Sequence, residues 1–233
     1  MTRRNGRDGT AGGEGDGVRA PRRPTLSLPE LRAHDGQGLT REGDHDGVEF
    51  ADADLGGQDG RGSRFLDCAL RRCALDEAVL SRARVLDSVL EEIRGVGTDL
   101  SGATLRDVEV LHARLGGTQL HGAALERVVV RGGKIDYLNL RDATLKDVVF
   151  EDCVLVEPDF GGARLERVAF VGCALRRADF SGARMTEVDL RAAAELDIAR
   201  GVDRLAGAVI SPTQLFDLAP VLAAWLGVRV VGA

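Results

Sequence analysis

Apolar residues recur at every fifth position from Phe50 to Leu190. The position holds Leu, Val, Ile, Phe or Met in every block except at Gly60 and Gly95. A second, usually small residue stands two positions earlier in most blocks. Neither the 3.6-residue period of a helix nor the two-residue period of a strand keeps both positions apolar every five residues. The pattern predicts a backbone that turns a corner every five residues. The small position includes Ala53, Ala78, Ala103, Ala123, Ala143, Ala163 and Ala178.

A longer period of twenty residues lies over the period of five. Valine recurs at the small position at 108, 128, 148, 168 and 188, with Val48 in the same phase. Four blocks of five make one square coil, so residues twenty apart should stack at the strand spacing of about 4.8 Å. Residues 46–190 then form about seven coils, a rod of roughly 35 Å.

Individual blocks resemble the repeat unit of the pentapeptide-repeat family, A(D/N)LxX. Examples are Ala-Asp-Phe-Ser-Gly at 178–182 and Ala-Thr-Leu-Arg-Asp at 103–107. The resemblance covers about three fifths of the chain and implies an all-β solenoid, the right-handed quadrilateral β-helix. It places the central Leu or Phe and the small residue inside, and we assign this β-helix to residues 46–205. A terminal coil is an unpaired strand edge, so each end needs a cap or a partner.

The N-terminal residues show no repeat. Residues 1–24 are rich in Gly and Arg with few large apolar residues, which predicts a disordered tail. Residues 25–45 are expected to form an N-terminal cap or linker. The short apolar piece of Leu26, Leu28 and Leu31 around Pro29 would pack on the first coil.

The C-terminal segment, residues 206–233, predicts a helix that begins near residue 211. Ser211 and Gln214 are spaced as a capping box, and Pro212 suits the first turn. Pro220 predicts a kink or a fresh start, and Gly227 is placed to end the helix. Residues 228–231 would add a short strand. Apolar residues follow helical spacing at Leu215, Leu218, Val221, Leu222 and Trp225.

The apolar face of this helix has two interpretations. It is either a lid over the final coil or a dimer interface formed by Leu215, Leu218, Leu222 and Trp225, and both can hold. The quinolone-resistance members of the family end in a helix that joins two solenoids end to end, and residues 207–231 are similar in layout. On that resemblance we expect a homodimer.

The charge and composition exclude several classes of function. The net charge of −6 argues against direct nucleic-acid binding, which requires a surplus of Lys and Arg on one face. No apolar stretch is long enough to span a membrane, and no signal peptide is evident, so we expect a cytoplasmic protein without a membrane partner.

The residues that usually carry chemistry do not converge. Cys68, Cys73, Cys153 and Cys173 all stand at the small inward position, so we expect buried free thiols. The four histidines share no metal-like spacing with each other or with the cysteines. A convex rod offers no obvious cleft. We therefore expect no enzyme, no cofactor and no metal site.

The outward residues carry the candidate contacts. One face presents an acidic ladder of Asp59, Asp99, Asp159 and Asp179, whereas the neighbouring face mixes Arg with Asp. Residues 46–190 hold 26 acidic and 19 basic side chains, a net charge of −7. Tyr137, the one tyrosine, is a further candidate contact residue.

These features favour a non-catalytic scaffold that presents charged faces to a protein partner as yet unknown. The alternative is a DNA mimic that modulates DNA gyrase, since some family members resemble duplex DNA in width and charge. The heavy admixture of Arg dilutes that likeness, and the usual role of charged solenoid residues is a solvated surface. The unbroken register over 48–190 also leaves no projecting loop of the kind on which plasmid-borne quinolone-resistance members depend. An enzyme that binds an adenylate or other metabolite would require a cleft.

Overall fold

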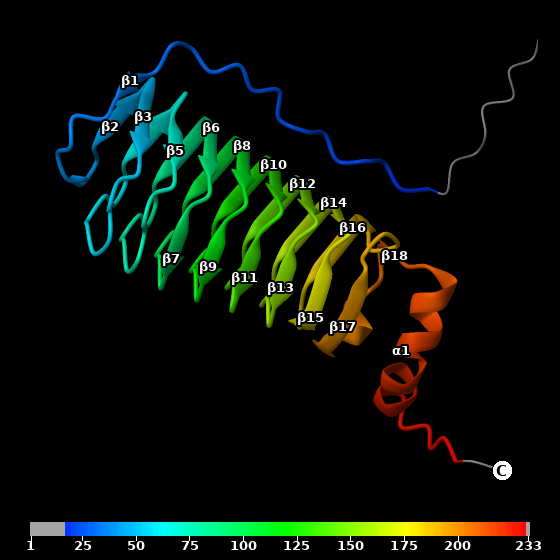
Figure 1. The fold of residues 1–233 in the computed structure, drawn as a ribbon. Helices are drawn as coiled ribbons and strands as arrows, with labels where there is room; N and C mark the ends of the chain where they lie inside the picture. Colours follow the sequence, from blue (N-terminus) through cyan, green and yellow to red (C-terminus); the bar gives the residue numbers. More distant parts are fainter. Residues whose placement is uncertain (1–16, 232–233) are drawn as a thin grey trace, which may run out of the picture.

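The protein is described over residues 17–231 by a computed structural model, in which the chain winds as a parallel β-solenoid with a helix at its C-terminal end (Figure 1). Within the described residues the strands form two sheets. The larger contains β1 (Arg32–Ala33), β2 (Asp44–Asp46), β3 (Val48–Ala51), β4 (Arg64–Leu66), β5 (Ala69–Arg71), β6 (Arg84–Glu91), β8 (Thr104–Leu111), β10 (Ala124–Arg131), β12 (Thr144–Glu151), β14 (Arg164–Val171), β16 (Arg184–Asp189) and β18 (Ala208–Val209). The smaller contains β7 (Arg94–Val96), β9 (Arg114–Gly116), β11 (Lys134–Asp136), β13 (Val154–Val156), β15 (Ala174–Asp179) and β17 (Glu195–Arg200).

Most strands of both sheets pair in the register that the period of twenty residues predicted. Leu125 of β10 pairs in parallel with Leu105 of β8 and Leu145 of β12, each twenty residues away. Each long strand of the larger sheet supplies two sides of a coil, and the smaller sheet supplies the third. A row of isolated bridges such as Gln119 to Asn139 forms the fourth. The four-sided β-solenoid inferred from the sequence is confirmed.

Corners recur with the same regularity. Every fifth residue from Glu42 to Glu187 has a positive φ, between 49° and 71°, whether or not it is glycine. This left-handed conformation costs an L-residue roughly 1 kcal/mol, so it persists only where the surrounding structure enforces it. Here the backbone hydrogen bonds between coils enforce it, for example from Asp142 N to Gly161 O at 2.8 Å.

The interior is filled by the two inward positions of each block. Phe150 stacks on Phe170 with ring centroids 5.0 Å apart, and Phe160 stacks on Phe180 at 5.1 Å. The small position also takes residues that can donate a hydrogen bond, as Thr98 Oγ1 does to Leu75 O at 2.7 Å. The core is therefore a continuous apolar column.

The solenoid has about nine turns, so the expected count of about seven was too low. Extra turns lie at both ends, where β1 pairs with β3 and β18 pairs with β16. The terminal turns depart from the five-residue pattern, so the count over residues 46–190 did not include them, although the β-helix assigned to residues 46–205 does include β17. In the last turn Gly201 and Gly207 have positive φ, and a Cβ there would lie 2.3 Å from Phe180 C and 2.0 Å from Met185 O.

Aromatic rings close the first coil. The His45 ring stacks on Phe65 at 4.8 Å and meets Phe50 edge-on at 5.2 Å, and the His34 ring stacks on Phe50 at 4.2 Å. Leu39 is buried beside them. Leu26, Leu28 and Leu31, expected on the first coil, are half-buried in the extended segment that precedes β1.

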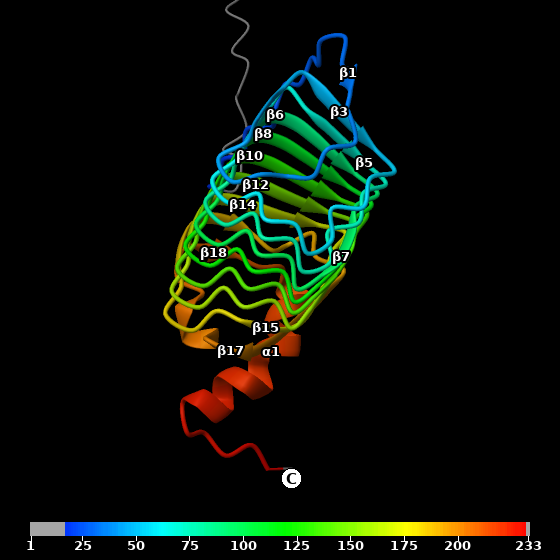
Figure 2. The same ribbon diagram turned by 90° about the vertical axis from the view of Figure 1, so that its left-hand side faces the viewer.

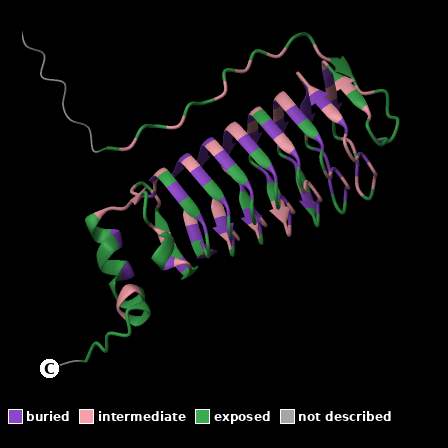
Figure 3. Cartoon of the chain, turned by 180° about the vertical axis from the view of Figure 1, so that it is seen from behind, coloured by how far each residue is buried: buried purple, intermediate pink, exposed green. Residues whose placement is uncertain are grey.

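Residues 17–31, here called the N-terminal arm, run in an extended path along the outside of the solenoid (Figures 1 and 3). The arm starts near β16 and ends near β1, so it spans most of the rod. For residues 17–24 this differs from the disordered tail that the composition predicted, because three arginines of the arm meet carboxylates of the body. Residues 1–16, the remainder of that predicted tail, lie outside the described residues.

The C-terminal end is closed by a short 3-10 helix, η1 (Val202–Arg204), and by α1 (Pro212–Trp225), which lies against the last coil (Figure 2). The predicted capping box of Ser211 and Gln214 is present. Gln214 Nε2 also donates to Leu190 O at 2.7 Å, which satisfies a carbonyl of the last coil. The helix continues through Pro220, and the strand expected at residues 228–231 is not formed.

Candidate functional site

The structure assembles the acidic ladder as a stacked row. Parallel bridges connect Asp59, Val79, Asp99, Gln119, Asn139, Asp159 and Asp179 in that order, one coil apart. All four aspartates are half-buried. The ladder therefore exists as a line of side chains on one side of the rod.

The ladder carboxylates also hold the corners of the coil. Asp99, Asp159 and Asp179 each accept a hydrogen bond from the backbone N–H two residues later, at 2.9, 2.7 and 2.8 Å. The amide oxygen of Asn139 does the same with Arg141 N at 3.1 Å. An aspartate or asparagine that binds its own backbone in this way stabilises a turn. These residues thus have a structural role in the coil.

Arginines neutralise part of the ladder. Asp59 pairs with Arg61 and Arg41, both at 2.9 Å. Their hydrogen bonds, that of Arg61 first, lower the pKa of Asp59 to about 2 against the opposing effect of desolvation. Arg141 lies 3.1 Å from Asp159, and Arg200 lies 3.6 Å from Asp179.

Another side of the rod carries a short basic row. Arg94, Arg114 and Lys134 are stacked in register on β7, β9 and β11. They line a groove together with several glycines and with the carboxylates of Asp76, Asp136 and Asp152. The rod is therefore a set of sides with different charge and not a uniformly acidic cylinder.

Tyr137 projects from a corner beside this basic row. Its φ is +55° and 59% of its surface is exposed. A bulky aromatic residue in the left-handed region is uncommon. Lys134 and Asp136, which form an ion pair at 3.1 Å, precede it in the same block.

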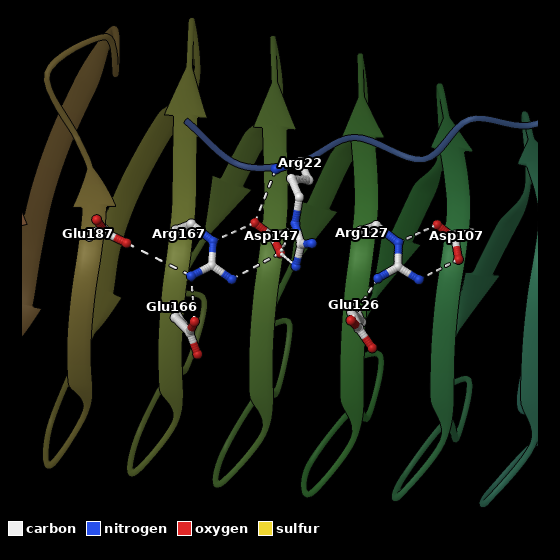
Figure 4. Close-up of polar contacts among 8 residues, drawn as sticks. All are labelled: Arg22, Asp107, Glu126, Arg127, Asp147, Glu166, Arg167 and Glu187. Atoms are coloured by element: carbon white, nitrogen blue, oxygen red, sulfur yellow. Dashed lines mark hydrogen bonds and ion pairs between the residues drawn. The ribbon is translucent and has the colours of Figure 1, made fainter. Parts of the chain in front are cut away.

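A second row of charges, here called the corner column, was seen only in part from the sequence. It comprises the left-handed corner residues Asp107, Arg127, Asp147, Arg167 and Glu187, one coil apart (Figure 4). Arg127 donates two hydrogen bonds to Asp107 at 2.6 and 2.7 Å, and Arg167 donates two to Asp147 at 2.7 and 3.0 Å. The acidic members belong to the face that the sequence predicted to mix Arg with Asp. Alternation of charge at twenty-residue spacing is the signal that would have revealed the pairs.

The N-terminal arm reaches this column. Arg22 donates to Asp147 from its backbone N–H at 3.1 Å and from its guanidinium at 2.9 and 3.1 Å. Arg19 donates to Glu187 at 2.7 Å, and Arg23 pairs with Glu151. Burial by itself raises the pKa of Asp147, but the hydrogen bonds of Arg167 and Arg22 outweigh it and hold that pKa well below its usual range.

An apolar strip lies next to the column at outward positions of the larger sheet. Val129, Val149 and Ala169 are 1%, 2% and 8% exposed, and they form a small cluster separate from the main core. Val18 and Pro21 of the arm line a pocket together with Val149 and Ala169. The arm therefore covers apolar surface that the repeat pattern would leave in water.

The candidate residues of helix α1 divide into two groups. Leu218 is 2% exposed and Leu222 packs against the core, so these two cap the last coil. Leu215 is 50% exposed and Trp225 is 59% exposed. Phe216 and Leu226 are exposed as well.

All four cysteines are free and buried, as expected, and burial raises the pKa of the Cys68 and Cys73 thiols. Over residues 17–231 no group of three or more His, Cys, Asp or Glu side chains is arranged to hold a metal ion. In the same range no helix is long and apolar enough to cross a bilayer.

Comparison with known proteins agrees with this geometry. A family model described as a pentapeptide repeat region matches residues 63–140, and one described as pentapeptide repeats in eight copies matches residues 159–193. Residues 63–140 and 159–193 therefore consist of repeats of the pentapeptide-repeat family.

Solved structures of two proteins resemble the chain. QnrB1, a plasmid-mediated fluoroquinolone resistance protein, is 19% identical over 84% of this chain and 95% of its own, with a TM-score of 0.37. HetL, a pentapeptide repeat protein involved in heterocyst differentiation regulation from the cyanobacterium Nostoc, is 23% identical over 72% of this chain and 90% of its own, with a TM-score of 0.32. No curated protein matches the sequence.

Proposed function

We propose that the protein is a non-catalytic scaffold whose charged sides bind another protein. The observation that carries this proposal is the apolar interior of the solenoid, in which the cavity lined by Leu90, Leu120 and Phe150 measures only about 50 Å³. Ordered rows of side chains on the outside are therefore the surfaces for recognition. Grooves on the body are open and lined by charged residues, such as the one beside Arg94 and Arg114. Solenoids present extended surfaces of this kind to partners.

We further propose a homodimer formed through helix α1. Exposed apolar residues gather on this one element at the end of the rod, and an exposed apolar patch of this kind typically marks an interaction site. Leu215 and Trp225 belong to the exposed face, whereas Leu218 and Leu222 serve as the cap. The interface would be a symmetric patch that meets its own copy.

The scaffold proposal is tested by comparing partners captured by the native protein and by variants of single sides. Asp99→Asn with Asp159→Asn removes ladder charge and keeps the corner, because Asn139 already holds a corner in this way. Arg94→Gln with Arg114→Gln changes the basic row. A partner retained by one variant and lost by the other supports a specific docking side. Identical capture by all three proteins would exclude docking on the acidic ladder and on the basic row.

A second candidate is modulation of DNA gyrase through mimicry of DNA. The row of carboxylates on one side of a rod favours it, although arginines partner several of them and another side carries a short basic row. A supercoiling assay with purified protein, with and without a quinolone and at two salt concentrations, tests it. Salt-sensitive inhibition or protection that weakens in the Asp99→Asn, Asp159→Asn and Asp179→Asn variants is the expected result. No effect at a large excess of protein would exclude this candidate and leave the scaffold.

A further inference from the structure

The N-terminal arm meets the body through three arginines and three carboxylates. Arg19 pairs with Glu187 of β16, and Arg22 and Arg23 pair with Asp147 and Glu151 of β12. Burial by itself raises the pKa of Glu151, but hydrogen bonds from Arg23 and Arg131 outweigh it and the pKa is lowered overall. The arm is thus held by ion pairs to β12 and β16.

The corner column contains two equivalent Asp–Arg pairs, one of which also binds the arm. Asp107 with Arg127 and Asp147 with Arg167 have the same geometry, two coils apart (Figure 4). The side chain of Asp107 is 17% exposed, whereas that of Asp147, which also binds Arg22, is fully buried. The two oxygens of Asp147 therefore accept hydrogen bonds from the body and from an extended peptide together.

The apolar strip supports the same conclusion. Val89 occupies the same row as Val129 and Val149 and is only half-buried, whereas the latter two are almost fully buried. Valine at an outward position of the repeat exposes apolar surface unless something covers it. Val18 and Pro21 of the arm line a pocket with Val149 and Ala169 and so provide that cover at these two residues.

The arm is attached in a way that permits its release. Residues 18–31 form no strand, so no ladder hydrogen bonds of the sheets depend on them. Arg22 and Arg23 remain 62% and 51% exposed in their side chains. Ion pairs of such exposed groups are weakened by salt and contribute modestly.

We propose that Asp147, Glu151 and Glu187, together with the strip of Val129, Val149 and Ala169, form a binding groove for an extended, arginine-bearing segment of a partner protein. The N-terminal arm is the resident intramolecular ligand of this groove and competes with the partner segment. This inference rests on the proposed function as an interaction scaffold and names the chemistry of one docking surface.

The test uses a labelled synthetic peptide of residues 17–31 and fluorescence anisotropy at low salt. In the full chain, Arg22→Ala with Arg23→Ala releases the arm and leaves the groove intact. We expect this variant to bind the peptide at least about tenfold more tightly than the native protein, because an occupied groove is available only for a fraction of the time. A peptide with Arg22→Gln and Arg23→Gln should lose this affinity.

Two further substitutions in the arm-released chain locate the binding. Asp147→Asn should abolish peptide binding, and the matched control Asp107→Asn should preserve it, with thermal melting used to verify that both variants are folded. Equal peptide affinity of native and arm-released proteins, or equal loss in the two Asn variants, would overturn the proposal. The peptide with Arg22→Gln and Arg23→Gln is tested against the same arm-released protein, so misfolding cannot explain the result. Undiminished binding of this peptide would also overturn the proposal. This assay uses a synthetic peptide and no captured partner. Its failure would therefore not contradict the scaffold proposal, which is tested separately by partner capture.

Discussion

Asp147 and Arg167 lie one coil apart and are joined by two hydrogen bonds of 2.7 and 3.0 Å at a corner of the solenoid. Both side chains are almost completely removed from water. A buried charge pair contributes little net stability, but removal of one partner leaves the other charge unpaired and is strongly destabilising. Substitution of either residue should therefore destabilise this corner.

Asp147→Asn should lower the free energy of unfolding by about 3 kcal/mol, because it removes the buried carboxylate that pairs with both Arg167 and Arg22, although Glu166 still pairs with Arg167. Asp107→Asn, at the equivalent but more exposed corner, should cost about 1 kcal/mol. Urea denaturation of both variants measures the difference. Since the folded chain holds the pKa of Asp147 below that of the unfolded chain, its contribution is complete above about pH 4 and is lost on acidification. Equal destabilisation of the two variants would contradict the burial argument.

The left-handed conformation of the corners predicts that an added side chain can destabilise the protein through backbone strain alone, without a steric clash. Gly122 has a φ of +66°, and a Cβ added there would meet no atom within 4 Å. Gly122→Val should nevertheless destabilise the protein by about 2 kcal/mol, because a β-branched residue is strained in the left-handed region. His121→Val is the matched control, since His121 is an exposed neighbour outside the left-handed corners. Thermal unfolding should separate the two variants, and similar melting temperatures would refute the prediction.

Substitutions in helix α1 should affect stability and self-association separately. Leu218→Ala removes a buried side chain of the cap and should cost about 3 kcal/mol of unfolding free energy. Leu215→Ser with Trp225→Ser alters exposed residues, so it should leave stability nearly unchanged and halve the mass seen by sedimentation equilibrium. A native protein that sediments as a monomer would dismiss the proposed dimer.

The first coil should be sensitive to pH. Burial, and secondarily the nearby His34, lower the pKa of His45, whereas Asp44 and Asp35 oppose this shift. The unfolded chain therefore takes up more protons than the folded chain as the pH falls below about 6.5, and stability declines in that range. His45→Leu should flatten the dependence of melting temperature on pH between 7.5 and 5. His121→Gln, which changes an exposed histidine, should retain the native profile; a flattened profile in this control would point to a different group.

The cysteines should be inert in the folded protein. Each is at most 1% exposed and lies in the apolar column. A thiol reagent should label none of the four before unfolding and all four in denaturant, because reaction requires an accessible thiolate. Rapid labelling of the native protein would show that the coils open locally.

The sequence predicted the body of the solenoid better than its ends and its surface. Inward positions such as Leu105 and Leu125 repeat the same environment, so period alone determined the register and the side of each residue. The capping box at Ser211 was equally local and was found. The arm was missed because Arg19, Arg22 and Arg23 have no periodicity and their partners are more than 120 residues away. The final turn was predicted only in part: the β-helix assigned to residues 46–205 includes β17 but not β18, and Gly201 and Gly207 support close approach where the pattern expects a bulky residue or a regular corner.

The strict recurrence of left-handed corners from Glu42 to Glu187 also constrains how the length of this chain can change. Inserting or deleting one residue in that span would shift every later side chain out of phase, with core residues moved outward and charged residues moved into the apolar column. Twenty residues is the increment that preserves both corner phase and side identity, and each such unit would lengthen the rod by about 4.8 Å. The distance between the aromatic cap at His45 and helix α1 can therefore vary only in discrete steps, so the spacing of features along the rod works as a molecular ruler.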